Sequence, residues 1–243
     1  MRVFFAEQND DGWLSLKGQD AKHVSLVLRM KEGDKLDVVL PSGDIASCMI
    51  ERIGEDEVLL RSLAFVPSYT ETKKKFILIQ GLPKGQKMDF IVEKCTELGF
   101  SEFRLAVTKH SVVRDSSEGK LERWRKLAHS AAKQSGRSRI PEVCEAEGLD
   151  TALRDVARRG ALVIFLWEHE ENKGLHSIEA EIRAAGEIVI VVGPEGGFST
   201  EEARSAEAMG AHLVNLGPRV LRTETAPIAA GSAVLYIAGE LQP

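Results

Sequence analysis

Residues 216–227, Leu-Gly-Pro-Arg-Val-Leu-Arg-Thr-Glu-Thr-Ala-Pro, are the most informative stretch of this 243-residue chain. A second unusual string precedes it at residues 192–199, Val-Gly-Pro-Glu-Gly-Gly-Phe-Ser. Each string follows a short apolar run and leads into a helical pattern. Because ligands of open α/β sheets bind outside the carboxyl ends of the strands, the two turns predict neighbouring loops of one small-molecule site.

The composition is that of an ordinary globular protein, with 43% hydrophobic and 28% charged residues. No apolar run approaches the roughly 18–20 residues that span a bilayer. The amino-terminal residues turn acidic at Glu7, which is unlike a signal peptide. The three cysteines, Cys48, Cys95 and Cys144, show no C-x-x-C spacing. Together these features predict a cytoplasmic protein with free thiols and no membrane association.

The charge is distributed unevenly, although the net charge is only -5. Residues 71–140 carry 16 Lys/Arg against 8 Asp/Glu, whereas the residues on either side are acidic. The densest part, 120–139, holds seven Lys/Arg and one Glu. A solvated helix face is the common explanation of such a run, but the contrast with the acidic remainder favours binding to a polyanion.

Residues 1–66 show the pattern of a small all-β domain. Short apolar runs alternate with turn formers, which favours a β-barrel, and 18–30 is the one expected helix. Residues 67–75 lack apolar periodicity and are expected to form a linker. The expected strands are 3–5, 13–16, 35–40, 46–53 and 58–63.

After the linker, strands and helices alternate, which predicts an α/β domain with a mostly parallel sheet. Gly99 fits the position just after a helix end. The expected strands are 76–80, 102–113, 161–167, 187–192 and 211–216, and the expected helices are 88–98, 121–135, 151–159, 177–185, 201–209 and 225–241.

The glycine-rich turn at 193–197 permits close approach of a ligand to the backbone. Ser199 and Glu202 have the spacing of a capping box. The spacing differs from dinucleotide-binding and Walker A motifs, no G-x-S-x-G elbow is present, and the histidines and cysteines show no zinc spacing. No metal is therefore expected. In the later string, a local Arg222–Glu224 ion pair would be the simpler structural explanation.

Both strings resemble those of the SPOUT class of S-adenosylmethionine-dependent RNA methyltransferases. The chain is most similar to one family within it, the 16S ribosomal RNA uridine-N3 methyltransferases of the small subunit. The resemblance covers essentially the whole chain. Four further stretches share it: Leu82-Pro83-Lys84-Gly85 with Lys87-Met88-Asp89; Glu93-Lys94 with Thr96-Glu97-Leu98-Gly99; Gln134-Ser135-Gly136-Arg137 with Arg139 and Pro141; and His23 with Leu28-Arg29 and Gly33-Asp34.

The resemblance implies a PUA-like, RNA-binding β-barrel over residues 1–70 and a SPOUT domain with a deep trefoil knot over residues 71–243. It also implies a homodimer whose active sites lie near the subunit interface. In this chain Ala132-Lys133 replaces a Cys-Glu pair expected in the family, which puts any role of those two side chains in doubt.

The implied activity is methyl transfer from S-adenosylmethionine to N3 of a uridine in 16S ribosomal RNA, with the small subunit as partner. Arg222 is the candidate to stabilise negative charge on the uracil, and Glu195 or Glu224 could accept the proton or hold an arginine. The implied cofactor-binding residues are Leu166, Trp167, Gly193, Pro194, Glu195, Gly196, Gly197, Leu216, Gly217, Leu221, Arg222, Thr223, Thr225 and Ala226. The candidates for RNA phosphate contacts are Arg2, His23, Arg29, Lys84, Lys87, Arg137 and Arg139.

Two other functions fit the same residues. One is a SPOUT methyltransferase that acts on a ribose 2′-hydroxyl or on a transfer RNA base, because the fold would be the same and the acceptor would differ. The other is a non-catalytic RNA-binding protein of ribosome assembly that keeps the cofactor pocket as a relic.

Overall fold

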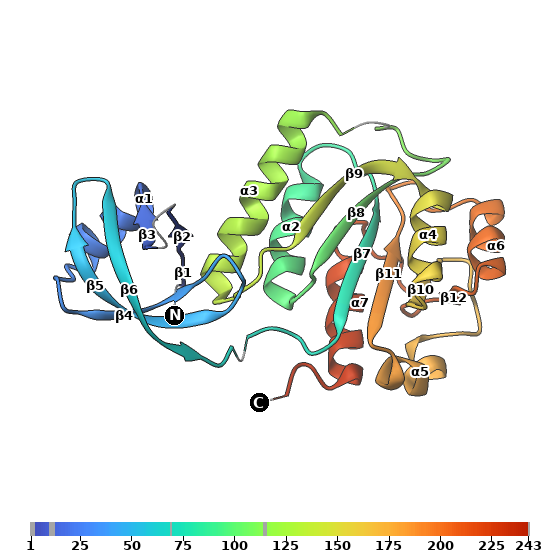
Figure 1. The fold of residues 1–243 in the computed structure, drawn as a ribbon. Helices are drawn as coiled ribbons and strands as arrows, with labels where there is room; N and C mark the ends of the chain where they lie inside the picture. The colour runs from blue at the N-terminus through green and yellow to red at the C-terminus, as the bar shows by residue number, and fades with distance from the viewer. Residues whose placement is uncertain (1–2, 10–12, 69, 114–115, 243) are drawn as a thin grey trace. The chain divides into compact units, whose positions relative to one another are not determined.

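The computed structural model describes residues 3–9, 13–68, 70–113 and 116–242 (Figure 1). The chain divides into two compact units. The first comprises Met1–Glu71 together with Ala132–Arg139, and the second comprises Thr72–Ala131 and Ile140–Pro243. A segment from the middle of the chain, which includes the last residues of helix α3 (Glu118–Ser135), therefore belongs with the amino-terminal strands.

The first unit is a curved, barrel-like sheet in the strand order β1-β4-β5-β6-β3-β2. All strand pairs are antiparallel except β1 with β4. Alternate residues of β5 point into a core that includes Leu16, Val38 and Ile50, which confirms the predicted barrel. The strands are β1 (Phe4–Phe5), β2 (Glu7–Gln8), β3 (Leu14–Lys17), β4 (Lys35–Val39), β5 (Ile45–Ile53) and β6 (Glu57–Val66).

The single helix expected at 18–30 is shorter and irregular. A four-residue α1 (Gln19–Lys22) continues as a π-helical turn, η1 (His23–Val27). The middle-chain segment is attached to this unit by buried ion pairs. Lys133 Nζ lies 2.6 Å from an Asp20 carboxylate oxygen, and Arg137 lies 2.8 Å from Glu71. Lys133 therefore has a structural partner in this chain, while Ala132 is fully buried.

The second unit contains a six-stranded, fully parallel sheet in the order β12-β10-β11-β7-β8-β9. This confirms the predicted α/β class. The strands are β7 (Lys75–Gly81), β8 (Glu102–Val107), β9 (Glu142–Gly148), β10 (Leu162–Leu166), β11 (Glu187–Val192) and β12 (His212–Val214). The helices, besides α3, are α2 (Lys87–Leu98), α4 (Leu149–Arg158), the 3-10 turn η2 (Leu175–Ile178), α5 (Glu179–Ala184), α6 (Thr200–Ala208) and α7 (Ala226–Ala238).

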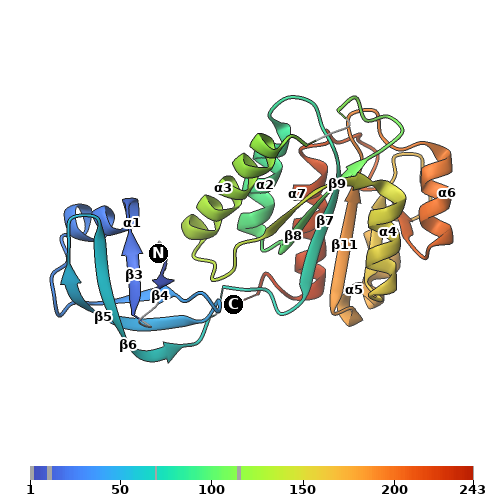
Figure 2. The same ribbon diagram turned by 45° about the horizontal axis from the view of Figure 1, so that its top comes forward.

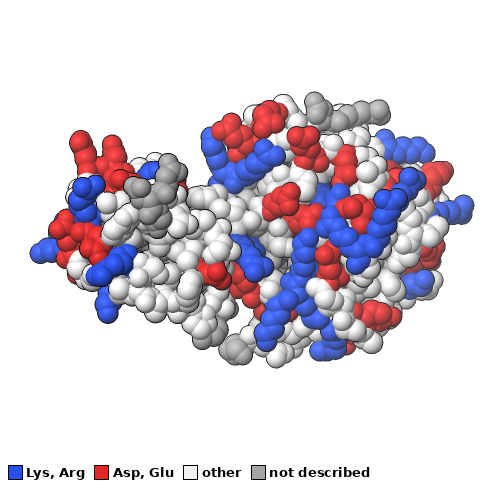
Figure 3. Space-filling model, viewed as in Figure 1, with Lys and Arg blue, Asp and Glu red and all other residues white. Residues whose placement is uncertain are grey.

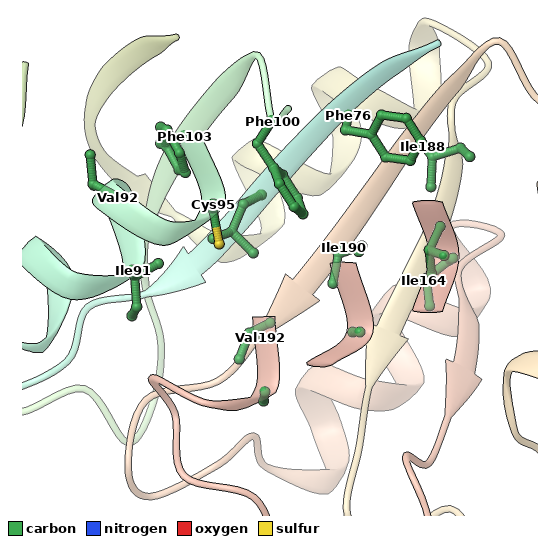
Figure 4. Close-up of a cluster of buried hydrophobic side chains, with 14 of the residues drawn as sticks. Phe76, Ile91, Val92, Cys95, Phe100, Phe103, Ile164, Ile188, Ile190 and Val192 are labelled. Carbon is green, nitrogen blue, oxygen red and sulfur yellow. The ribbon is translucent and has the colours of Figure 1, made fainter. Parts of the chain in front are cut away.

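Helices cover both faces of this sheet (Figure 2). On the central strand β7, Phe76 and Leu78 pack with α2, α3, α5 and α7, whereas Ile77 and Ile79 pack with α4 and α6. Figure 4 shows part of the first of these clusters. Burial on both faces explains why the strands are continuous apolar runs rather than alternating ones.

Strands β8 and β9 also differ from the sequence expectation. The strand expected at 102–113 ends at Val107, because Thr108 begins a turn in which its N–H donates to Ser111 Oγ at 3.0 Å. Strand β9 was not expected, since it lies at the sheet edge and is largely polar. The trefoil knot concerns the threading of the chain, which strand order alone does not test, and it stays a prediction.

Candidate functional site

The two informative strings meet at the carboxyl edge of the parallel sheet. Strands β11 and β12 flank β10, so the loops that follow all three strands lie together. They line a cavity of about 580 Å³, a size typical of small-molecule sites. Twelve of the predicted cofactor-binding residues line it: Leu166, Trp167, Gly193, Pro194, Glu195, Gly197, Leu216, Gly217, Leu221, Arg222, Thr223 and Ala226.

Gly196 and Thr225 belong to the same loops but do not line the cavity. Gly196 instead lies against His110, whose Nδ1 is 2.8 Å from the Gly196 carbonyl oxygen. Residues that the sequence analysis did not assign to a ligand also line the cavity. They include Glu168, Phe198, Asn215 and Arg219.

The glycines of the first loop are required by close packing. A Cβ on Gly196 would lie 2.9 Å from His110 Cβ, and one on Gly197 would lie 3.0 Å from a Glu168 carboxylate oxygen. Gly197 also has a positive φ of 63°, which glycine adopts without strain. The loop then enters α6 through the predicted capping box, in which Ser199 and Glu202 each bond the backbone of the other.

The second loop is held by hydrogen bonds to its own backbone. Asn215 Oδ1 accepts from the Gly217 N–H at 2.8 Å. The Arg222 carbonyl accepts from the Thr225 N–H at 2.8 Å and from the Ala226 N–H at 2.9 Å, which closes the turn that leads into α7. The Arg222 side chain is thereby carried at a helix start, where free backbone N–H groups favour negative charge.

The charged groups at this cavity are only partly neutralised. Within the described residues, neither Arg219 nor Arg222 forms an ion pair, and Glu168 has a 3.8 Å contact with His169 but no Lys or Arg partner. The Arg222–Glu224 pair that would have been the simpler explanation is not among the ion pairs formed. Glu224 instead lies 3.5 Å from Lys87 Nζ. Arg222 is thus left available to a ligand.

Glu195 is the most strongly held of these carboxylates. One of its oxygens accepts from Lys87 Nζ at 2.8 Å and from the Lys84 N–H at 3.1 Å. Partial burial would raise the pKa of Glu195, but these donors outweigh it and the pKa lies below its ordinary value. The hydrogen bond that Lys87 donates to Glu195 in turn raises the pKa of Lys87. The pair is therefore ionised at neutral pH, with Lys87 at the cavity wall.

The candidates for RNA contacts are placed differently from one another. Arg29, Lys84 and Arg139 are exposed, and His23 is half-buried with its ring 5.8 Å from that of Phe4. Lys87 lines the cavity instead. Arg137 is only 2% exposed and pairs with Glu71, the position of a structural ion pair rather than of a phosphate contact. Arg2 lies outside the described residues.

The basic middle third is largely compensated by acidic side chains. Figure 3 shows Lys/Arg interleaved with Asp/Glu rather than gathered in one basic patch on the face in view. On α3, Arg123 pairs with Asp89 of α2, and Lys126 pairs with Glu122 at 2.6 Å. The sequence excess of cations therefore overstates the positive charge that the surface offers to a polyanion.

The described residues also bear on membrane-spanning and metal-binding functions. No helix there has the length and apolar character needed to cross a membrane. No group of three or more His, Cys, Asp or Glu side chains there is placed to hold a metal ion.

Comparison with known proteins first defines the class. Residues 70–235 match the family model of the RNA methyltransferase domain, and residues 16–61 match that of the RNA methyltransferase PUA domain. The parallel-sheet unit with its cavity and the barrel thus correspond to the two parts of an RNA methyltransferase.

Full-length relatives then define the family. The Ribosomal RNA small subunit methyltransferase E of Bacillus subtilis (strain 168) is 32% identical over 229 residues, which cover 91% of this chain and 89% of the relative. That of Mycobacterium bovis is 32% identical, with coverage of 89% and 84%. The crystal structure of the Neisseria gonorrhoeae protein of the same name, bound to S-adenosyl methionine, matches with a TM-score of 0.83, 28% identity and 98% coverage of each chain. The chain belongs to the ribosomal RNA small subunit methyltransferase E family.

Proposed function

We propose that this protein transfers the methyl group of S-adenosylmethionine to N3 of a uridine in the 16S ribosomal RNA of the small subunit. The observation that carries the proposal is the cavity at the carboxyl edge of the parallel sheet, where Arg219, Arg222 and Glu168 lie without Lys, Arg or carboxylate partners among the described residues. The Neisseria relative, whose structure holds S-adenosyl methionine, supports it.

The cavity fits this ligand in shape and in charge. A Cβ at Gly193 would lie 3.2 Å from the Gly197 backbone and one at Gly197 would lie 3.0 Å from Glu168 Oε1, so the two glycines let the cavity wall pack tightly. S-adenosylmethionine carries cationic sulfonium and ammonium groups, a carboxylate and ribose hydroxyls. Glu168 can accept hydrogen bonds from the hydroxyl or ammonium groups of this ligand, and Arg219, which has no ion-pair partner among the described residues, can pair with its carboxylate.

In the reaction, S-adenosylmethionine supplies the electrophilic methyl group. Uridine N3 must lose its proton, and its Watson–Crick edge must be unpaired. Arg222 and Lys87 place two cations at the cavity, where they would stabilise negative charge on the uracil ring. Because the pKa of Glu195 is lowered, we assign Glu195 to holding Lys87. Glu224 then remains the candidate proton acceptor.

The first unit would bind RNA. Its family match is to a PUA domain of RNA methyltransferases, and the proposed domains are residues 1–70 for RNA binding and 71–243 for catalysis. The exposed cations Arg29, Lys84 and Arg139 are retained as phosphate-contact candidates, together with Arg2 and His23. Arg137 is withdrawn because its guanidinium is buried against Glu71.

The proposed assembly is a cytoplasmic homodimer. Helices α2 and α7 pack together, and Phe90 of α2 and Tyr236 of α7 are both exposed large apolar residues. Exposed aromatic side chains of this kind are common in subunit interfaces. A cytoplasmic location accords with three cysteines that are all unpaired.

The test is transfer of labelled methyl from S-adenosylmethionine to small subunits that lack the modification, followed by digestion to nucleosides. Free ribosomal RNA and transfer RNA are run in parallel. The proposal predicts 3-methyluridine. Label on a ribose or on transfer RNA would show a different acceptor for the same fold. Cofactor binding without label in any RNA would indicate a non-catalytic assembly protein.

A further inference from the structure

A buried amide lies behind the cavity, at the carboxyl end of strand β7. The Gln80 side chain is wholly buried. Its Nε2 lies 3.0 Å from the Gly81 carbonyl oxygen, 3.3 Å from that of Gly193 and 3.0 Å from Thr223 Oγ1. Gly193 begins the first cavity loop, and Thr223 directly follows Arg222 in the second. One amide thus contacts both loops that form the site.

The hydrogen atoms in this cluster have defined places. The Thr223 hydroxyl donates its one proton to the Gly193 carbonyl, 2.6 Å away. Its oxygen must therefore accept from Gln80. Since every polar atom within reach of Gln80 Nε2 is an oxygen acceptor, that position requires the amide nitrogen rather than the amide oxygen. A carboxylate in the same place could donate nothing.

The amide oxygen of Gln80 shows that fold stability does not explain this residue. Gln80 Oε1 is buried and has no hydrogen-bond partner among the described residues. An unsatisfied buried acceptor lowers the stability of the fold. The neighbouring residues of β7, from Phe76 to Ile79, are all apolar. An apolar side chain at position 80 would avoid that cost, so the contribution of Gln80 is its N–H donors.

We infer that Gln80 is a positioning residue that, together with Thr223, fixes the two cavity loops in the arrangement that binds S-adenosylmethionine. Gln80 does not line the cavity, so it acts through the loops. The adjacent Gly81 packs tightly on the same loop, since a Cβ there would lie 2.5 Å from Pro194 Cδ. The Thr223 hydroxyl is therefore bonded inside the protein rather than to a ligand. The identity of the ligand in this inference rests on the proposed function.

The experiment replaces the donors and measures binding separately from stability. In Gln80→Met the shape is kept and both donors are lost. The dissociation constant of S-adenosylmethionine, measured by calorimetry on the full chain, should rise about tenfold or more, because loop preorganisation is lost. The melting temperature should change by no more than about 3 °C, because the unsatisfied oxygen is removed as well. Gln80→Glu should weaken binding at least as much.

Substitutions of Thr223 form the second part of the experiment. Thr223→Val, which is close in shape but lacks the hydroxyl, should reproduce the Gln80→Met loss, and Thr223→Ser should recover most of the binding. The dissociation constant of the double variant Gln80→Met/Thr223→Val should be no more than about threefold higher than that of either single variant, because the two side chains act as one unit.

Ser101→Ala is the matched control, since Ser101 Oγ donates to the Phe76 carbonyl at the opposite end of the same strand, at 3.0 Å. It should leave cofactor affinity unchanged. Unaltered affinity in Gln80→Met would overturn the inference. So would a loss of affinity in both Gln80→Met and Ser101→Ala that follows an equally large fall in their melting temperatures. If the wild-type protein itself fails to bind S-adenosylmethionine, the proposed function fails instead.

Discussion

The two ends of the parallel sheet differ in how completely their charged side chains are paired. At the amino ends of the strands, Lys75, Glu102 and Glu187 join a network with residues of β8 and α4. Arg104, in the middle of β8, extends this network along the sheet: it bonds Glu147 at 2.6 Å and also pairs with Asp155. At the carboxyl ends, Arg219, Arg222 and Glu168 are left without such partners in the described part of the chain.

This difference separates structural from functional charge on one scaffold. Burial would lower the pKa of Arg104, but its bonds to Asp155 and Glu147 outweigh that effect and raise it, so Arg104 stays charged and paired. Permanently paired charges have little capacity left for a ligand. Unpaired charges in a cavity keep theirs, which is why the carboxyl end is where we place the chemistry.

The largest expected effect comes from the unpaired end. Arg222→Ala should lower the turnover number about 10²- to 10³-fold, because it removes a preorganised cation from the developing charge. The dissociation constant of S-adenosylmethionine should change only a few-fold. The matched control is Arg158→Ala, an exposed arginine of α4. Single-turnover methyl transfer with calorimetry tests both values, and near-normal turnover in Arg222→Ala would remove Arg222 from the mechanism.

A substitution in the ion-pair network around Arg104 should lower the stability of the fold rather than the activity. Arg104→Met leaves Glu147 without its ion-pair partner and removes one of the two partners of Asp155. Because the arginine is buried but these carboxylates are partly exposed, the loss should cost about 1–3 kcal/mol of the free energy of unfolding. Denaturant unfolding measures that loss. Cofactor affinity of the folded variant should match that of the wild type. A tenfold weaker affinity at a temperature where the variant is folded would break the division between the two ends.

The pH dependence of stability should show whether Glu195 is a structural carboxylate or a general base. Its folded-state pKa is lowered from 4.5, so its stabilising contribution is complete above the unfolded pKa and is lost as the pH falls through the folded one. The melting temperatures of wild type and Glu195→Gln should therefore differ by a constant amount at neutral pH and converge only below about 4.5. A wild type that instead loses stability relative to Glu195→Gln as the pH rises from about 4.5 to 7 would show a Glu195 with the raised pKa of a base.

The smallest effect is expected from the cysteines. Burial, followed by the nearby Glu142 carboxylate, raises the pKa of Cys144 to about 11, and Cys48 and Cys95 are buried. Very little thiolate is present at pH 7.5. Iodoacetamide should react slowly with the native protein and leave methyl transfer intact. Rapid alkylation with parallel loss of activity would place a reactive thiol at the site, contrary to this account.

Local signals in the sequence predicted the elements that carry the site. The glycines at 193–197 and the capping box at Ser199 stand as expected, and the apolar run that ends at Val192 forms β11. The run expected to end at Leu216 forms β12, which ends earlier, at Val214. These features depend on residues close together in the chain. The family resemblance added S-adenosylmethionine and the barrel, which periodicity alone does not identify.

The remaining features depend on contacts between distant residues. Lys87 and Glu195 are 108 positions apart, and nothing in either local sequence shows that they pair. Gln80 interrupts an apolar strand, a signal of a buried polar contact, but its partner Thr223 lies 143 positions away. Strand β9 was missed because only its pairing with β8 makes it a strand.

The most direct test of where the cofactor binds is hydrogen–deuterium exchange of the full chain with and without saturating S-adenosylmethionine. The account predicts slower exchange at the carboxyl edge of the sheet, in residues 193–199 and 216–226, with no change in the amino-end network around Arg104. Protection confined to other segments, despite saturation confirmed by calorimetry, would contradict the assignment of the unpaired end as the cofactor site.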